Sequence, residues 1–144
     1  MKTLLFLTAD FANLTQDNKV NILGIFNQIF AHKFPTMHSQ FSLVVKVGLE
    51  TGEEPKNRKL TLFLVGEDAN IARVKLLEET FNFPERIGGL DPEHSVIMNV
   101  RGMVFPVPGT YQFLLHIDDR FLSSLSLNLG TSPQPQLPQP QTGE

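Results

Sequence analysis

The sequence predicts an all-β protein built as an antiparallel β-sandwich of about eight strands. Apolar and polar side chains alternate with period two in several runs, most clearly over residues 41–50 and 110–118. Clusters of glycine, proline, asparagine and aspartate separate these runs, as turns do between strands. Apolar residues make up 41% of the 144-residue chain, which is ordinary for one globular domain that buries its own core.

The chain opens with an apolar run over residues 3–9, which suits a strand buried on both faces. Asp17-Asn18 is the predicted tip of the hairpin that follows. Residues 31–40 are expected to be a connector, with Phe34-Pro35 in extended geometry.

Residues 20–30 are predicted to return as a second long strand. Gly24 in its middle indicates a bulge or a close backbone approach. A helix over 21–31 is the alternative, because the apolar residues also fit helical spacing. The many β-branched side chains and Gly24 favour the strand.

In the second half, residues 51–58 are read as a polar hairpin loop that brings strand 59–65 back onto the preceding one. The run 71–82 is extended but less regular, with a possible short helix near 73–79. A long loop over 84–93 is expected to cross from one sheet to the other. The remaining predicted strands are 95–105, with a bend at Gly102, 110–118 and 121–129.

A proline-rich corner precedes the strand over 110–118. Pro106 and Pro108 fix φ and withhold backbone donors, and Gly109 permits a positive φ. Tyr111 follows at once, which resembles the tyrosine corner of immunoglobulin-like sandwiches. We therefore predict an immunoglobulin-like sandwich in which Pro108, Gly109, Tyr111 and Gly24 have structural roles.

Composition divides the chain into a sandwich domain over 1–130 and a Pro/Gln-rich tail over 131–144. The tail cannot bury enough apolar surface to offset its ordering entropy, so we expect it to be disordered. Its Pro-x-x-Pro pattern at 135–138 formally matches ligands of aromatic-lined grooves, but no basic flank accompanies it, so a solvated tail is favoured. The apolar run near the N-terminus is too short for a signal peptide, and no window is apolar enough to span a membrane, so a cytoplasmic location is expected.

Charge and cysteine content exclude several kinds of function. Twelve basic and 15 acidic residues give a net charge of −3, which argues against a general binder of nucleic acid or of anionic membranes. The absence of cysteine excludes disulfides, thiolate catalysis and zinc ribbons. With no tryptophan and one tyrosine, an aromatic platform for carbohydrate is disfavoured.

No catalytic constellation is recognisable, so we expect no enzyme activity, no cofactor and no metal. His32 and His38 lack a third ligand at a suitable spacing. Adjacent carboxylates in single turns are weak evidence for calcium, which needs several converging oxygens. The loop with Asp91, Glu93 and His94 leaves a metal site or a metal-dependent hydrolase as a minor alternative.

The favoured function is a protein–protein interaction or assembly module. Phe30, Phe34, Met37 and Phe41 lie close in sequence and are only partly explained by alternation, so they are the candidate interaction residues. Self-association through a sheet edge or through this Phe-rich connector is expected. A small-ligand or carbohydrate-binding sandwich is the alternative.

Three stretches resemble an uncharacterised bacterial family of small cytosolic β-sandwich proteins, known only as a domain of unknown function. They are 5–12, 18–26 with the following Phe34-Pro35, and 108–113 with the following Ile117-Asp118. The resemblance covers residues 1 to about 130. It implies a β-sandwich but supplies no activity or ligand residues; the matching positions, whose role beyond structure stays open, are Asp10, Asn21, Gly24 and Phe26.

Overall fold

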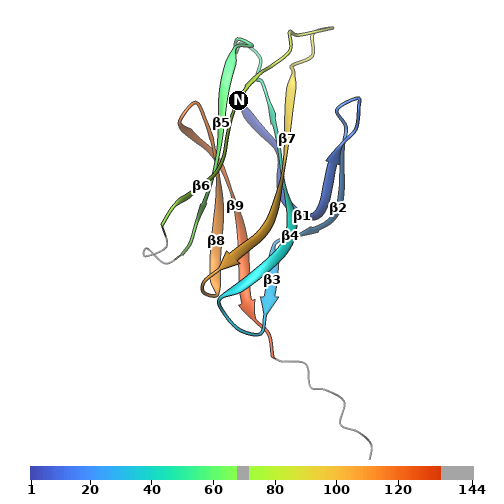
Figure 1. The fold of residues 1–144 in the computed structure, drawn as a ribbon. Coiled ribbons are helices and arrows are strands. Elements are labelled where there is room, and N and C mark those ends of the chain that lie inside the picture. Colours follow the sequence, from blue (N-terminus) through green and yellow to red (C-terminus); the bar gives the residue numbers. More distant parts are fainter. Residues whose placement is uncertain (68–71, 134–144) are drawn as a thin grey trace, which may run out of the picture.

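The computed structural model describes residues 1–67 and 72–133, and these form an all-β protein without helices (Figure 1). The strands are β1 (Lys2–Leu14), β2 (Val20–Phe26), β3 (Gln28–Ala31), β4 (Thr36–Gly48), β5 (Asn57–Val65), β6 (Val74–Asn82), β7 (Glu93–Phe105), β8 (Gly109–Ile117) and β9 (Arg120–Thr131). They form a four-stranded sheet, β2-β1-β4-β7, and a five-stranded sheet, β3-β9-β8-β5-β6. The all-β prediction is confirmed, with nine strands where about eight were expected.

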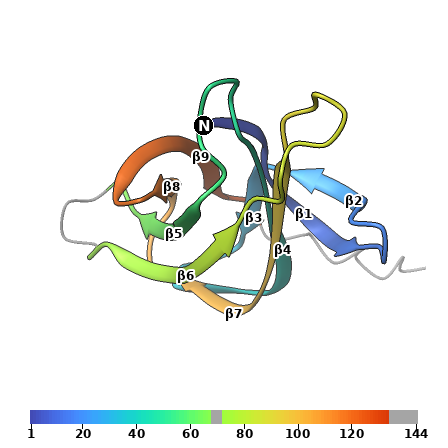
Figure 2. The ribbon, with the colours of Figure 1, turned by 90° about the horizontal axis from the view of Figure 1, so that it is seen from above.

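The core lies between the two sheets, which face each other with the five-stranded sheet curled (Figure 2). Its largest fully buried side chains include Phe41 of β4, Phe113 of β8 and Phe105 of β7. The rings of Phe41 and Phe113 meet edge to face across the two sheets, with centroids 6.2 Å apart. Burying each such ring contributes about 1.5–3 kcal/mol, so these contacts hold the sheets together.

The chain changes sheet more often than the sequence predicts. The loop over 84–93 does cross between sheets, as expected, because β6 and β7 belong to different sheets. Residues 51–58, however, also cross: β4 pairs with β1 and β7, while β5 pairs with β6 and β8. The predicted hairpin between 41–50 and 59–65 is therefore wrong. Period-two alternation shows which side chains face a core, but not which sheet a strand joins.

The expected single strand over 20–30 is two strands, and the helical alternative is wrong. The chain leaves the four-stranded sheet after Phe26 and enters the five-stranded sheet at Gln28. There β3 pairs with β9 in parallel, with Phe30 opposite Gly130. The five-stranded sheet is therefore mixed, and the prediction of a wholly antiparallel fold is wrong at this strand.

Two further boundaries differ. β4 begins at Thr36, so the connector is shorter than residues 31–40. The possible helix near 73–79 is wrong, because this segment lies within edge strand β6 apart from its first residue. The register of β6 on β5 shifts so that Leu77 pairs with Leu62 and Lys75 with Phe63. Leu76 is the extra residue of this bulge, which breaks the alternation and leaves a pattern that looked helical.

The corner before β8 carries the chain from the four-stranded to the five-stranded sheet. Tyr111 is buried, and its ring packs edge to face on Phe105 with centroids 5.0 Å apart. Its hydroxyl donates to the Val107 carbonyl oxygen at 2.7 Å and accepts from the Val107 N–H at 3.3 Å. Gly109 has a φ of +135°, which its lack of Cβ makes accessible. One side chain thus satisfies both backbone groups of Val107.

Replacing Tyr111 by phenylalanine is expected to lower the free energy of unfolding by about 0.5–1.5 kcal/mol, since the ring stays buried while the hydroxyl's bonds to Val107 are lost. Urea unfolding followed by circular dichroism measures the difference. An unchanged unfolding midpoint would show that the hydroxyl contributes nothing to this corner.

The predicted domain boundary at residue 130 falls inside β9, which ends at Thr131. The Ser132 N–H donates to the Ala31 carbonyl oxygen at 2.9 Å, which continues the pattern of the β3–β9 pair. The rest of the predicted tail, residues 134–144, lies outside the described residues.

Candidate interaction edge

The four predicted interaction residues do not form one exposed group. Phe41 is fully buried in the core, so its assignment to an interaction surface is wrong. Phe34 is half-buried and packs against the core. Phe30 and Met37 are exposed, with 66% and 64% of their surface accessible.

Met37 and Phe41 have the same parity on β4, yet only Phe41 faces the core. The partner strand β7 shows the same change on the two sides of Gly102, which has a φ of +64°. Before this glycine Val100 is buried opposite Phe41, whereas after it Val104 is exposed opposite Met37. The side of the sheet that faces inward therefore changes at the level of Gly102, where the sequence predicted a bend.

Phe30 has a contact within the fold despite its exposure. A Cβ atom placed on Gly130 would lie 3.4 Å from two carbons of the Phe30 ring. The ring therefore covers the bare backbone of β9 at the position directly opposite. An aromatic side chain across from a glycine commonly shields it in this way.

Two exposed apolar residues on β2 were not predicted as interaction residues. Leu23 and Ile25 of β2 are each 66% exposed. Leu23 lies opposite Phe11 and Ile25 opposite Ala9 on β1, so these side chains share one face of the strand pair. Phe11 is also exposed, which extends the apolar surface onto β1. The period-two pattern could not find them, because an edge strand has the same alternation as a core strand.

β2 and β3 together form one open side of the molecule, which we call the β2–β3 edge (residues 20–31). β2 is an outer strand of the four-stranded sheet and β3 an outer strand of the five-stranded sheet, and they follow one another along the chain (Figure 1). No residue from 20 to 31 carries a charge. This uncharged run is the signal by which the sequence could have indicated the edge.

The opposite side of the molecule, where β6 and β7 form the outer strands, is charged and joined across the sheets (Figure 2). The ring of His94 on β7 stacks on Phe81 of β6, with centroids 4.0 Å apart. His94 Nε2 also lies 3.2 Å from the Glu79 carboxylate. Charged side chains on these two strands include Lys75, Glu78, Glu79, Glu93 and Arg101. Such charges protect an outer strand against pairing with another chain.

Gly24 makes the close backbone approach that the sequence allowed, and not a bulge, because the register of β1 on β2 is the same on both sides of it. Its φ is +72°, and a Cβ there would overlap the carboxylate of Asp10. Asn21 donates from Nδ2 to Oδ1 of Asn13 on β1 at 3.0 Å. The contacts of Asp10, Asn21 and Gly24 therefore lie within the β1–β2 pair.

The acidic loop does not converge on one point. Asp91, Glu93 and His94 line an open hollow of about 920 Å³, but each has its own partner. Asp91 accepts from Arg86 at 2.7 Å and from Thr51 at 3.0 Å, and these bonds hold its pKa below the ordinary value. Glu93 pairs with Lys46 at 2.9 Å. Within residues 1–67 and 72–133 no group of three or more His, Asp or Glu side chains is placed to hold a metal ion.

The remaining histidines are also dispersed. His32 Nδ1 lies 3.3 Å from the Ser132 hydroxyl. His38 packs against the rings of Phe26 and Phe41, with centroids 5.8 and 5.7 Å away. In the part of the chain that the structure describes, no helix has the length and apolar character needed to span a membrane.

Fold and edge together define a class: a small two-sheet all-β domain with one charged side and one uncharged, partly apolar side. The chain belongs to the family of unknown function DUF6941, whose profile matches residues 4–130. The expected resemblance to an uncharacterised domain family is thereby confirmed.

No curated protein matches the chain. Among solved structures, the Pseudomonas fluorescens alkylpurine DNA glycosylase AlkC, bound to DNA containing an abasic site analog, has a TM-score of 0.50 at 9% identity, over 89% of this chain and 30% of that one. A β-glucosidase from Listeria innocua in complex with glucose has a TM-score of 0.49 at 8% identity, over 75% of this chain and 15% of that one. The superoxide reductase (neelaredoxin) from Ignicoccus hospitalis has a TM-score of 0.37 at 13% identity, over 72% and 75%. The chain thus spans under a third of the first two proteins, and the likeness to the glycosylase concerns the fold alone.

Proposed function

We propose that this protein is a non-enzymatic assembly module that binds a second copy of itself through the β2–β3 edge. The supporting observation is an open edge of twelve consecutive uncharged residues with Leu23, Ile25 and Phe30 exposed. Outer strands present unpaired N–H and C=O groups, and an uncharged apolar one is a ready site for strand pairing.

Self-pairing is the form of association that suits β2. In a two-fold dimer the same strand from each copy runs antiparallel to its partner, so each residue faces a residue of its own strand. Like charges placed opposite one another destabilise such a pair, and β2 has none. The register of β2 on β1 is the same on both sides of Gly24, so β2 keeps one alignment on its neighbour along its length. Pairing would continue the four-stranded sheet of one copy into that of the other.

The finer features expected of the chain belong to this proposal. They are an immunoglobulin-like sandwich topology and a cytoplasmic location in a bacterium. The turn at Tyr111 and the parallel pairing of β3 with β9 support the first. The family resemblance supports the second.

The test replaces Ile25 by lysine, because this side chain is exposed and a charge there would be placed inside the uncharged, apolar contact between two β2 strands. Sedimentation velocity over a range of concentrations measures the association. We expect the wild-type chain to dimerise and Ile25→Lys to be monomeric, with the dissociation constant raised by about tenfold or more.

Val74→Lys is the matched control, since Val74 is an exposed apolar residue at the start of the outer strand β6. This variant should dimerise like the wild type. Circular dichroism checks that both variants are folded. A wild-type chain that stays monomeric, or an Ile25→Lys chain that still dimerises fully, would refute self-association through this edge.

A further inference from the structure

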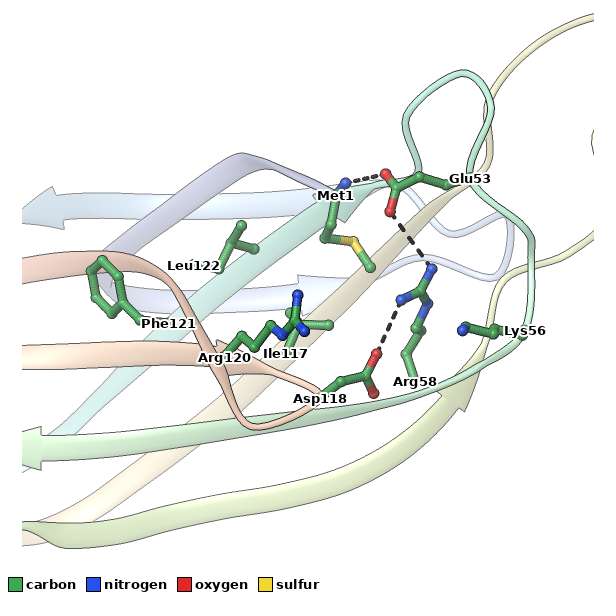
Figure 3. Close-up of a pocket in the computed structure, with 9 residues that line it drawn as sticks. All are labelled: Met1, Glu53, Lys56, Arg58, Ile117, Asp118, Arg120, Phe121 and Leu122. Atoms are coloured by element: carbon green, nitrogen blue, oxygen red, sulfur yellow. Dashed lines mark hydrogen bonds and ion pairs between the residues drawn. The ribbon is translucent and has the colours of Figure 1, made fainter.

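A pocket of about 530 Å³ opens beside the turn that joins β8 to β9 (Figure 3). Its walls come from the start of β1, the segment between β4 and β5, and the turn between β8 and β9. The volume lies within the range of about 300–1,000 Å³ that is usual for small-molecule sites. The pocket is distinct from the β2–β3 edge, since no residue of that edge lines it.

The inner part of the pocket is apolar. Ile117 is almost fully buried, Leu122 is half-buried, and the side chain of Met1 has only 8% of its surface accessible. Phe121 stands at the rim with its ring largely exposed. These side chains offer a surface against which the apolar part of a ligand could pack.

Arg58 forms ion pairs with the two carboxylates that line the pocket, those of Glu53 and Asp118. Its Nη1 donates to Asp118 at 3.0 Å, and its Nη2 lies 3.6 Å from Glu53. Burial opposes the ionisation of Asp118, but the N–H of Lys59 and the Arg58 guanidinium hold its pKa below the ordinary value. The α-ammonium of Met1 likewise contacts Glu53 and lowers the pKa of its carboxyl group. Both carboxylates are therefore ionised and already neutralised.

Two further cations line the pocket. Lys56 and Arg120 reach into it from the β4–β5 segment and from β9 (Figure 3). Neither makes a direct ion pair with a residue of 1–67 or 72–133, although the charge of Lys56 is a minor cause of the lowered pKa of Asp118. The lining thus has three basic side chains against two acidic ones, in a chain whose net charge is −3. An excess of positive charge beside an apolar floor is a site for an anion with an apolar body.

We propose that this pocket binds a small organic acid whose carboxylate is bound by two cations of its lining, Lys56 and Arg120, and whose apolar group packs on Ile117, Leu122 and Phe121. Arginine and lysine form short charge-assisted hydrogen bonds with a carboxylate, and these fix the orientation of the ligand. Arg58 forms ion pairs with Glu53 and Asp118, which reduces the repulsion between these carboxylates and the acid.

The experiment uses 4-phenylbutyrate as the probe, with 4-phenylbutyramide as its neutral counterpart and acetate as the charge alone. Isothermal titration calorimetry on the full chain measures the affinities, and chemical-shift changes in amide NMR spectra locate the site. We expect the acid to bind about tenfold or more tightly than either comparator. The largest shifts should fall on Ile117, Arg120 and Phe121.

The double variant Lys56→Gln with Arg120→Gln should reduce binding of the acid to the level of the amide and leave the amide unchanged. Lys33→Gln with Arg101→Gln removes the same charge from exposed sites outside the pocket and should not alter binding. The proposal is overturned by equal affinity for acid and amide, by absent binding, or by shifts that map elsewhere. Equal weakening in both double variants would mean that only net charge attracts the acid, which also overturns it.

Discussion

Replacing Phe41 by alanine is expected to lower the free energy of unfolding by about 3–5 kcal/mol, the usual cost of removing a buried phenylalanine ring. Phe41 is fully buried on β4, the strand between β1 and β7. Its ring contacts Phe113 on the opposite sheet and Phe26 on β2. The cavity left by alanine would be lined by these rings, which cannot close over it without distorting both sheets.

Guanidinium chloride unfolding followed by circular dichroism measures this change. Met37→Ala is the matched control, because Met37 is an exposed apolar residue on the same strand; it should cost less than about 0.5–1 kcal/mol. If the two substitutions had similar effects, the assignment of Phe41 to the core and Met37 to the surface would be wrong.

Gly24→Ala is expected to destabilise the protein by about 2–4 kcal/mol, through two separate causes. A side chain at a φ of +72° adds about 1–2 kcal/mol of backbone strain. The new Cβ would also overlap the Asp10 carboxylate, and such overpacking costs about 1–3 kcal/mol. Thermal unfolding monitored by calorimetry gives the size of the effect.

Gly52 separates the two causes. Its φ is +94°, but a Cβ there would meet no atom within 4 Å, so Gly52→Ala should show the strain alone. Asp10→Ala combined with Gly24→Ala should recover part of the loss, because the carboxylate is gone. A double variant whose loss equals the sum of the single losses would show that the two residues do not interact.

Much of the fold could be predicted because the alternation of apolar and polar residues indicates which side chains of each strand are buried. The β8 pattern of Tyr111, Phe113, Leu115 and Ile117 is buried as expected. The short gap between the predicted strands 110–118 and 121–129 is a tight turn, in which Asp118 and Asp119 both have a positive φ, as tight hairpins require. These features depend on neighbouring residues only, so one sequence contains them.

What the sequence missed depends on contacts between distant segments. Nothing local at residues 26–28 says that the chain changes sheet there, because the partner of β3 is β9 at the far end of the domain. The prediction of a Phe-rich interaction group failed for a related reason: the change of inward face between Phe41 and Met37 lies beside Gly102, on another strand. The pocket brings together residues 1, 53–58 and 117–122, which no spacing rule connects.

The passage from β2 to β3 means that one short segment closes both layers along the same side. If residues 20–31 detach, each sheet loses an outer strand in a single event, so the fluctuation should be cooperative across the two layers. Slow-exchanging amides in the two strands would then lose protection at the same denaturant concentration. A partner that binds β2 or β3 alone would therefore also slow the exchange of amide hydrogens with solvent in the other strand.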